Sequence, residues 1–407
     1  MADISVLSVL LHDQQIGTLT QLTGDRNIFA FTDEYIANSA RSTLSLSFKD
    51  PHGNLITDYN ATQTRVGPFF ANLLPEAHLR DYLAARAGVK SVRDFPLLWA
   101  LGEDLPGAIR ILSADGESWP RDDESAKVDL SDENTPLRFS LAGVQLKFSA
   151  LMEASGGLTI PARGVGGHWI VKLPSNTYEG VPENEFAMMS LASKLGMDVP
   201  EIMLVDLPEI EGMPSGIGSL KGKAFAIERF DRTEDGPVHI EDFAQIYGVY
   251  PNKKYEKASY RNIANVIWIE TGEQGLAEFI RRLIFNILIG NADMHLKNWS
   301  FIYPGKVNAQ LAPAYDFVST IAFLKDDKLA LSFGHSKNWE DVNDEELSWF
   351  IGKAQLPGKL VRDTATETVS DFLELWEKEK VHLTLTEDAR SSIDEHLKKV
   401  PLVSELS

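Results

Sequence analysis

Residues 275–289 carry the pattern that most constrains the fold of this chain. Apolar side chains recur there at spacings of three and four, which is the period of an α-helix that buries one face. The residues at these spacings are Leu276, Phe279, Ile280, Leu283, Ile284, Ile287 and Leu288. Gly290 follows at once, and glycine is common just past a helix because it adopts left-handed backbone angles at little cost. The sequence therefore predicts a buried helix that ends at Gly290.

A polar loop follows this helix, with the sequence GNADMHLKNWS. Asp293 and Asn298 lie five positions apart in it. Kinase catalytic loops have the same spacing between the Asp that accepts the proton of the attacking hydroxyl and an Asn that binds magnesium. Asp316, at the end of a predicted hairpin of two short strands, would supply a second hard oxygen ligand for magnesium. The spacing alone also fits a capped turn, so the prediction of phosphoryl transfer depends on the context of helix, loop and hairpin.

Two further polar residues, His295 and Lys297, lie in the same loop. We expect His295 to orient the loop through a hydrogen bond rather than to bind zinc, because no second His or Cys stands at ligand spacing. Lys297 could neutralise charge on the phosphoryl group during its transfer. The chain has no cysteine, which excludes disulfides, thiolate nucleophiles and Cys-ligated zinc.

A cation for the nucleotide phosphates is expected on a strand of the smaller lobe. Lys172 lies between apolar residues in HWIVKLP, where burial of the strand would leave its amine in need of a counter-charge. ATP phosphates would provide one, and Glu185, at the start of a predicted helix over residues 184–195, could provide another. The alternative is a lysine on an edge strand that extends its amine into solvent.

The order of predicted elements indicates an α+β chain of several parts. A hairpin at residues 6–22, two further strands before residue 47 and a helix at residues 69–88 would form a first subdomain. Short strands then precede a mainly helical region, which favours an antiparallel sheet lobe beside a helical one. The strands are expected at residues 139–152, 168–174, 201–207 and 223–230. We therefore divide the chain into an N-terminal subdomain (1–112), an acidic connection (113–135), a sheet-rich nucleotide-binding lobe (136–240) and a helical catalytic lobe (241–407).

The charge of the chain limits its direct partners. Lys and Arg total 39 against 59 Asp and Glu, a formal net charge of −20, which would repel a nucleic-acid backbone over most of the surface. The same acidity would also simply keep a protein soluble. The sequence has neither the start of a secretory signal nor eighteen consecutive apolar residues, so we expect a cytoplasmic protein without a membrane segment.

Six motifs, taken in order, resemble the HipA family of bacterial serine/threonine kinases, the toxins of two-protein toxin–antitoxin systems. They are RFSLAGVQLKFSAL, HWIVKLP, ENEF, AIERFDR, LIGNADMHLKNWSF and APAYDF, and the N-terminal NLLPE agrees with them. The resemblance implies a two-lobed, protein-kinase-like fold with an extra N-terminal α/β subdomain and a mainly helical C-terminal lobe. It also implies ATP and Mg²⁺ as cofactors.

The resemblance also assigns roles to single residues. Asp293 would be the catalytic base, Asn298 and Asp316 the magnesium ligands, and Lys172 the lysine on the ATP phosphates. The phosphate-binding loop would comprise Ser140, Ala142, Gly143, Val144, Gln145 and Lys147, although it has one glycine and lacks the G-x-G-x-x-G pattern. Glu228, Arg229 and Phe230 would lie at the hinge beside adenine, and Gln245 near the nucleotide. Ser140 matches the serine that such kinases phosphorylate on themselves.

The partners follow from the same resemblance. It implies a small helix-turn-helix antitoxin of HipB type, DNA reached mainly through that antitoxin, and a protein substrate such as an aminoacyl-tRNA synthetase. Two alternatives stay open at this point. The chain could be a catalytically weak co-repressor or docking module, or a small-molecule kinase of the aminoglycoside or choline type.

Overall fold

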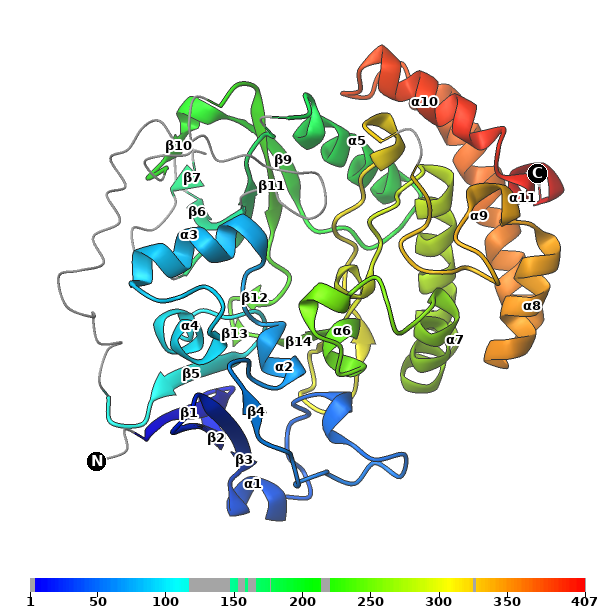
Figure 1. Ribbon diagram of the computed structural model, residues 1–407. Coiled ribbons are helices and arrows are strands. Elements are labelled where there is room, and N and C mark those ends of the chain that lie inside the picture. The colour runs from blue at the N-terminus through cyan, green and yellow to red at the C-terminus, as the bar shows by residue number, and fades with distance from the viewer. Residues whose placement is uncertain are drawn as a thin grey trace.

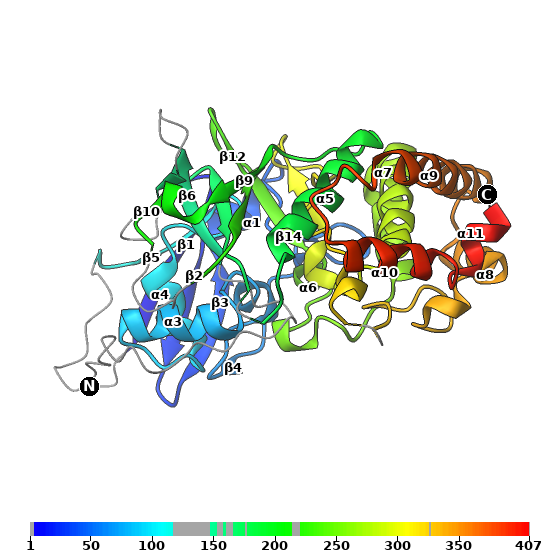
Figure 2. The same ribbon diagram turned by 90° about the horizontal axis from the view of Figure 1, so that it is seen from above.

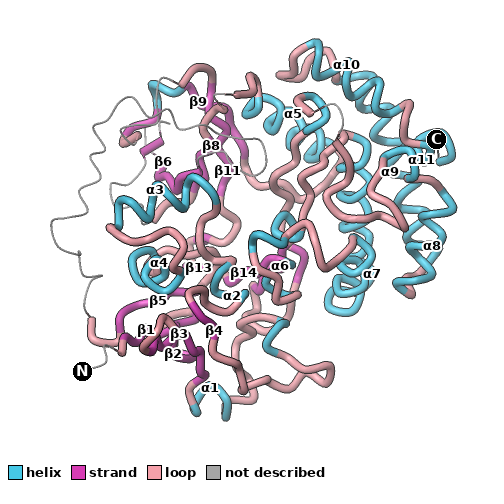
Figure 3. Tube along the Cα trace, in the orientation of Figure 1, coloured by secondary structure: helices cyan, strands magenta, loops and turns pink. Residues whose placement is uncertain are grey.

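The structure is a computed structural model that describes residues 4–116, 147–152, 158–159, 166–175, 177–213, 220–324 and 327–406. Strands gather in the N-terminal half of the molecule and helices in the C-terminal half (Figures 1 and 3). Seen from above, the two halves lie side by side, with α7 to α11 at the end away from the N-terminus (Figure 2). Ser140, Ala142, Gly143, Val144 and Gln145 lie outside the described residues.

The N-terminal part is an antiparallel sheet with the strand order β4-β3-β2-β1-β5. Its strands are β1 (Ser5–Leu11), β2 (Gln14–Leu22), β3 (Arg26–Phe31), β4 (Thr62–Gln63) and β5 (Ile109–Ser113). The predicted hairpin is confirmed, and its two turn residues His12 and Asp13 have φ of 50° and 63°, as a tight hairpin turn requires. Two further strands were predicted between this hairpin and residue 47, and the structure has only one of them, β3. Thr32 instead caps the short helix α1 (Asp33–Ala37) by accepting from the Tyr35 N–H, and η1 (Leu46–Phe48) follows.

The helix predicted over residues 69–88 is divided into α2 (Pro68–Ala71) and α3 (Ala77–Ala87). Pro75 explains the break, since it cannot donate to a helix and disfavours helical angles in the residue before it. Gly88 ends α3 with a left-handed φ of 68°, as predicted. The break leaves a short connecting segment, residues 72–76, that is free to contact other parts of the chain. Helix α4 (Asp94–Leu101) follows.

The second sheet has the order β10-β7-β6-β8-β11-β9 among the described strands. Its neighbours are antiparallel, as predicted, apart from the parallel pair β10 and β7. The strands are β6 (Lys147–Met152), β7 (Leu158–Thr159), β8 (Trp169–Lys172), β9 (Ile202–Asp206), β10 (Ile210–Glu211) and β11 (Lys223–Glu228), with η3 (Leu207–Glu209) before β10. Helix α5 (Val181–Lys194) packs on β9 and β11. It begins earlier than predicted because Pro182 suits the first turn of a helix.

The helical half is built around α7 (Tyr260–Leu288), with α9 (Gly358–Glu379) packed along it. Every apolar residue predicted for the buried face of α7 is at most 1% exposed. Gly290 has a φ of 65°, and a Cβ there would lie 2.5 Å from the Ile321 side chain, so both backbone angle and space require glycine. The prediction of a buried helix that ends at this glycine is confirmed.

Shorter elements complete this half. A three-stranded sheet has the order β14-β15-β16, and the two-stranded hairpin of β12 and β13, which contacts the N-terminal part through Arg232, precedes it in the chain. These strands are β12 (Arg232–Thr233), β13 (Gly236–Pro237), β14 (His239–Asp242), β15 (Ser300–Tyr303) and β16 (Gln310–Leu311). The other helices are α6 (Phe243–Ile246), η4 (Pro251–Lys253), η5 (Leu296–Asn298), η6 (Thr320–Ala322), η7 (Trp339–Asp341), α8 (Asp344–Ala354), α10 (Glu387–Leu397) and α11 (Pro401–Leu406). Within the described ranges, no helix combines the length and apolar character needed to span a membrane.

Candidate active site

The polar loop after α7 is held together by its own amide side chains. Asn291 accepts from the Asp293 N–H through Oδ1 (3.0 Å) and donates from Nδ2 to the backbone oxygen of Asp316 (3.1 Å). Asn298 donates from Nδ2 to the backbone oxygen of Asp293 (2.8 Å). Asn291 therefore ties the loop that carries Asp293 and Asn298 to Asp316, which follows a different element in the sequence.

Asp293 has the environment of a general base. Its side chain is 30% exposed, and one carboxylate oxygen, Oδ1, accepts a hydrogen bond from the Tyr255 hydroxyl. Burial raises the pKa of Asp293 to about 6, although the Tyr255 hydrogen bond and the Lys254 charge act to lower it. A carboxylate with a pKa near the working pH is suited to accept a proton during a reaction.

His295 is buried and neutral. Burial, followed by the charge of Lys254, lowers the pKa of His295 to about 3. Its Nε2 lies 3.9 Å from Asp293 Oδ1, too far for a hydrogen bond, and its ring packs edge-on against Tyr255 with centroids 5.0 Å apart. The expected hydrogen bond from this side chain is therefore not formed to Asp293, and His295 contributes to the site through packing.

Lys172 lies on β8 between β6 and β11, and it is only 4% exposed. The alternative of a solvent-exposed lysine on an edge strand is therefore wrong. Its amine contacts the carboxylates of Glu185 on α5 and of Asp316. Burial alone would lower the pKa of Lys172, but the two carboxylates outweigh burial and raise it, so the amine stays charged.

Asp316 receives a second cation, Lys147, whose Nζ lies 3.3 Å from Oδ2. Burial opposes ionisation of this carboxyl, yet Lys147 and Lys172 hold its pKa well below the usual range. The backbone of Asp316 is left-handed, with a φ of 58°, an angle that few residues other than glycine adopt without strain. Asp316 is thus a partly buried residue with an uncommon backbone angle beside two lysines, a combination found at functional sites.

Asn298 and Asp316 fit the chemistry of a magnesium site. The Asn298 amide nitrogen is engaged with the loop backbone, which leaves the carboxamide oxygen as the ligand atom. Magnesium commonly binds one or two protein oxygens together with phosphate oxygens and water. These two residues would hold the ion, and the ion would neutralise phosphate charge.

Lys297 and Gln245 are engaged elsewhere than expected. The Lys297 amine donates to the backbone oxygen of Asn72 (2.9 Å) and lies 3.2 Å from Glu76 Oε1, both in the segment between α2 and α3. Gln245 accepts from the Asp242 N–H (2.9 Å) and donates to the backbone oxygen of Phe69 (3.1 Å). Both side chains thus attach the N-terminal subdomain to the polar loop and α6, and among the described residues neither contacts Lys172 or Asp316.

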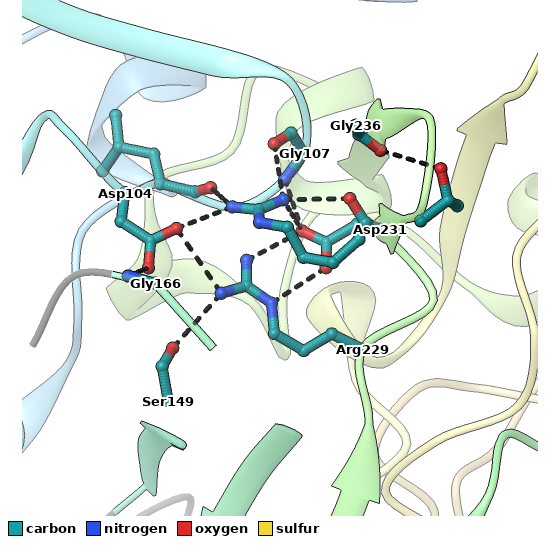
Figure 4. Close-up of polar contacts among 10 residues, drawn as sticks. Asp104, Gly107, Ser149, Gly166, Arg229, Asp231 and Gly236 are labelled. Carbon is teal, nitrogen blue, oxygen red and sulfur yellow. Dashed lines mark hydrogen bonds and ion pairs between the residues drawn. The ribbon is translucent and has the colours of Figure 1, made fainter. Parts of the chain in front are cut away.

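The predicted hinge is fixed by a buried charge cluster (Figure 4). Arg229 is 7% exposed and makes a bidentate contact to Asp231, with both distances 3.0 Å. Its third nitrogen lies 3.5 Å from Asp104 of the N-terminal subdomain, and Arg232 donates to the same Asp104 oxygen (2.7 Å). The Arg229 side chain is therefore committed to this cluster. Of the other predicted hinge residues, Glu228 is exposed at the end of β11, and the Phe230 ring lies 5.8 Å from that of Tyr315.

Tyr255, Lys254, Asn72 and Glu76 belong to this region but were not predicted as site residues. Tyr255 and Lys254 lie on the segment before α7, which shows no catalytic motif in the sequence. Asn72 and Glu76 are the ends of the NLLPE motif, which indicated a family but no role. Only the folding of distant segments against the loop reveals these contacts.

Tyr255→Phe is expected to shift the pH dependence of phosphoryl transfer. The Tyr255 hydrogen bond lowers the pKa of Asp293, so its loss should raise this pKa further above 6. The acid limb of kcat against pH should then move to higher pH, because Asp293 must be ionised to accept a proton. A pH–rate profile of both proteins measures the shift, and coincident acid limbs would contradict it.

The architecture defines the class of protein. One half contains a sheet with an internal lysine that is paired to a glutamate on a helix. The other half is helical and has a polar loop after its central helix. This arrangement is typical of a two-lobed kinase-like fold, here with an extra N-terminal sheet. The model of the HipA-like C-terminal domain matches residues 139–376, and the model of the HipA N-terminal domain matches residues 7–112. The chain belongs to the HipA family of kinases.

Individual relatives agree with this assignment. A putative kinase of Sinorhizobium fredii, Y4dM, is 53% identical over 410 residues, covering 100% of both chains. The serine/threonine-protein kinase toxin HipA of Shewanella oneidensis is 26% identical over 90% of this chain and 88% of its own length. A solved complex of HipA, HipB and operator DNA from Shewanella oneidensis contains a chain similar to this one, with a TM-score of 0.73 and 24% identity over 98% of this chain and 96% of that chain. At that identity the last likeness shows the fold alone.

Proposed function

We propose that this chain is an ATP- and Mg²⁺-dependent serine/threonine protein kinase. The observation that carries the proposal is the convergence of Asp293, Asn298 and Asp316, in which Asn291 links Asp293 to Asp316 and Asn298 bonds the Asp293 backbone directly. Lys172, paired with Glu185 and Asp316, supplies the buried cation that phosphoryl transfer requires. In this proposal Asp293 accepts the proton, Asn298 and Asp316 bind the metal ion, and Lys172 neutralises phosphate charge.

In this mechanism the acceptor hydroxyl loses its proton to the Asp293 carboxylate. The hydroxyl oxygen forms a bond to the γ-phosphorus as the bond to the β–γ bridging oxygen breaks, so the products are ADP and a phosphorylated acceptor. Tyr255 occupies Oδ1 of Asp293 and leaves Oδ2 for the acceptor. Lys172 and Lys147 offset the charge of the phosphates beside Asp316.

The proposed biological role is that of a growth-inhibiting toxin held back by a small helix-turn-helix antitoxin of HipB type. The solved Shewanella relative is described as a complex with HipB and operator DNA, which supports a partner of this kind. The net charge of −20 favours contact with DNA mainly through the antitoxin. The proposed substrate is a cellular protein such as an aminoacyl-tRNA synthetase.

Autophosphorylation of Ser140 is part of the proposal and depends on the family resemblance, because this residue lies outside the described part of the chain. A phosphate there would add about −1.5 to −2 charges to a loop that would hold ATP phosphates, and repulsion would switch the enzyme off. Ser140→Ala protein incubated with ATP should incorporate less phosphate into itself, as measured by intact mass. Equal incorporation would exclude this serine.

The acceptor class is the main test of the proposed function. Purified protein, γ-labelled ATP and a cell lysate should give labelled protein bands that are absent with Asp293→Asn. Label confined to small molecules would instead support the aminoglycoside- or choline-kinase alternative. No transfer, together with retained repression by the antitoxin complex, would support the docking module.

A further inference from the structure

The segment between α2 and α3, residues 72–76, lies against the catalytic loop although it belongs to the N-terminal subdomain. Glu76 places one carboxylate oxygen 3.2 Å from the Lys297 amine and the other 3.0 Å from the Lys254 amine. Lys297 also donates to the backbone oxygen (2.9 Å) and side-chain oxygen (3.2 Å) of Asn72. One carboxylate therefore joins two lysines from different parts of the chain.

The two lysines belong to the two segments that hold Asp293. Lys297 lies in the same loop, between Asp293 and Asn298, while Lys254 immediately precedes Tyr255, whose hydroxyl donates to Asp293. The Lys254 backbone oxygen also accepts from the Leu296 N–H of the loop (3.2 Å). Glu76 thus bridges the loop that carries the base and the segment that supplies its hydrogen-bond donor.

The charge of Glu76 is stable in this position. Burial opposes its ionisation, but Lys297 and Lys254 outweigh burial and lower its pKa to about 2. Without this carboxylate, the Lys254 and Lys297 amines would lose their common counter-ion, and Lys297 would keep only the more distant Asp242 carboxylate at 3.6 Å among the described residues. The polar loop after α7 and the segment before α7 would then lose the ion pairs that join them through Glu76.

We propose that Glu76 is a positioning residue for phosphoryl transfer, which acts from the N-terminal subdomain by joining, through Lys254 and Lys297, the two segments that hold Asp293. This inference rests on the proposed kinase function for its kinetic consequence. Glu76 has no contact with Lys172 or Asp316 among the described residues, so its effect belongs to the transfer step rather than to nucleotide binding.

The kinetic test is Glu76→Gln in the full-length protein. We expect kcat to fall about 10- to 100-fold, since small misplacement of a catalytic group has effects of this size, while KM for ATP changes little. Glu34→Gln, an exposed change on α1, is the matched control and should leave both parameters unchanged.

Hydrogen exchange gives a readout that needs no activity. Glu76→Gln should speed amide exchange in residues 291–300 and leave β8 and β11 unchanged, and combining it with Lys254→Met should add little, because the two residues act as a pair. Unchanged exchange in the loop would overturn the inference whatever the kinetics show. Faster loop exchange in a protein whose wild type transfers no phosphate would keep the positioning role and contradict the proposed function instead.

Discussion

Asp293→Asn is expected to lower the rate of phosphoryl transfer by a factor of about 10²–10⁴, the usual contribution of a general base. Asn keeps the size of the side chain but cannot take a proton from the acceptor hydroxyl. ATP affinity should be retained, because the groups proposed to meet the phosphates, Lys172 and Lys147, are bound to Asp316 and not to Asp293. The expected result is therefore a protein that binds nucleotide and does not transfer phosphate.

The measurement pairs single-turnover transfer with ATP binding by calorimetry. Asp371→Asn, an exposed change on α9, should behave as wild type in both. If Asp293→Asn transfers phosphate at the wild-type rate, Asp293 is not the base. If ATP binding is lost as well, the carboxylate has a role in nucleotide binding that the geometry does not predict.

Asp231→Asn is expected to lower the free energy of unfolding by about 3–5 kcal/mol, the cost of removing one partner from a buried ion pair. Asp231 is 5% exposed and binds Arg229 through two contacts, Arg232 through one (2.9 Å) and the Gly107 N–H (2.8 Å). The substitution keeps the shape but removes the charge, so two guanidinium groups would share Asp104 alone. Denaturant unfolding followed by fluorescence measures the loss.

The matched control is Asp235→Asn at the exposed tip of the β12–β13 hairpin, which follows Asp231 in the chain. This substitution should change the free energy of unfolding by less than about 0.5 kcal/mol.

The pH dependence of stability gives a second check. Burial raises the pKa of Asp231, but Arg229 and Arg232 outweigh it, so the folded-state pKa is lowered. Its charge therefore stabilises the fold above about pH 4 and ceases to do so as pH falls toward the lowered pKa, and the difference between wild type and variant should shrink there. A variant as stable as wild type at pH 7 would contradict the role given to the cluster.

Local patterns were the reliable guide to the fold. The apolar spacing of α7 and the need for glycine at position 290 are properties of one segment, and both are confirmed. The apolar neighbours of Lys172 predicted an amine in need of a counter-charge, but only the structure decides between an internal strand and an edge strand. The helix predicted over residues 69–88 is present in two pieces, because its apolar period continues through Pro75, whose effect on the backbone interrupts it.

The contacts between distant segments could not be predicted in this way. Lys297 lies in the loop between Asp293 and Asn298, a position that suggested contact with the phosphates. Only the structure shows that Glu76 is a partner of its amine. Gln245 is a helix-capping residue by its local geometry, with Asp242 as the reciprocal partner. Tyr255 carries no motif at all, and its hydroxyl meets Asp293 because the segment before α7 folds back on the loop.

The paired state of Lys172 has a consequence for how the site would respond to salt. An open basic surface attracts anions over a distance, and dissolved ions weaken that attraction strongly. Here the amine is already matched by two carboxylates within the protein, so an arriving polyphosphate exchanges places with one of them rather than meeting a bare positive charge. Nucleotide affinity should accordingly vary little with ionic strength, and simple anions such as chloride or sulfate should compete poorly.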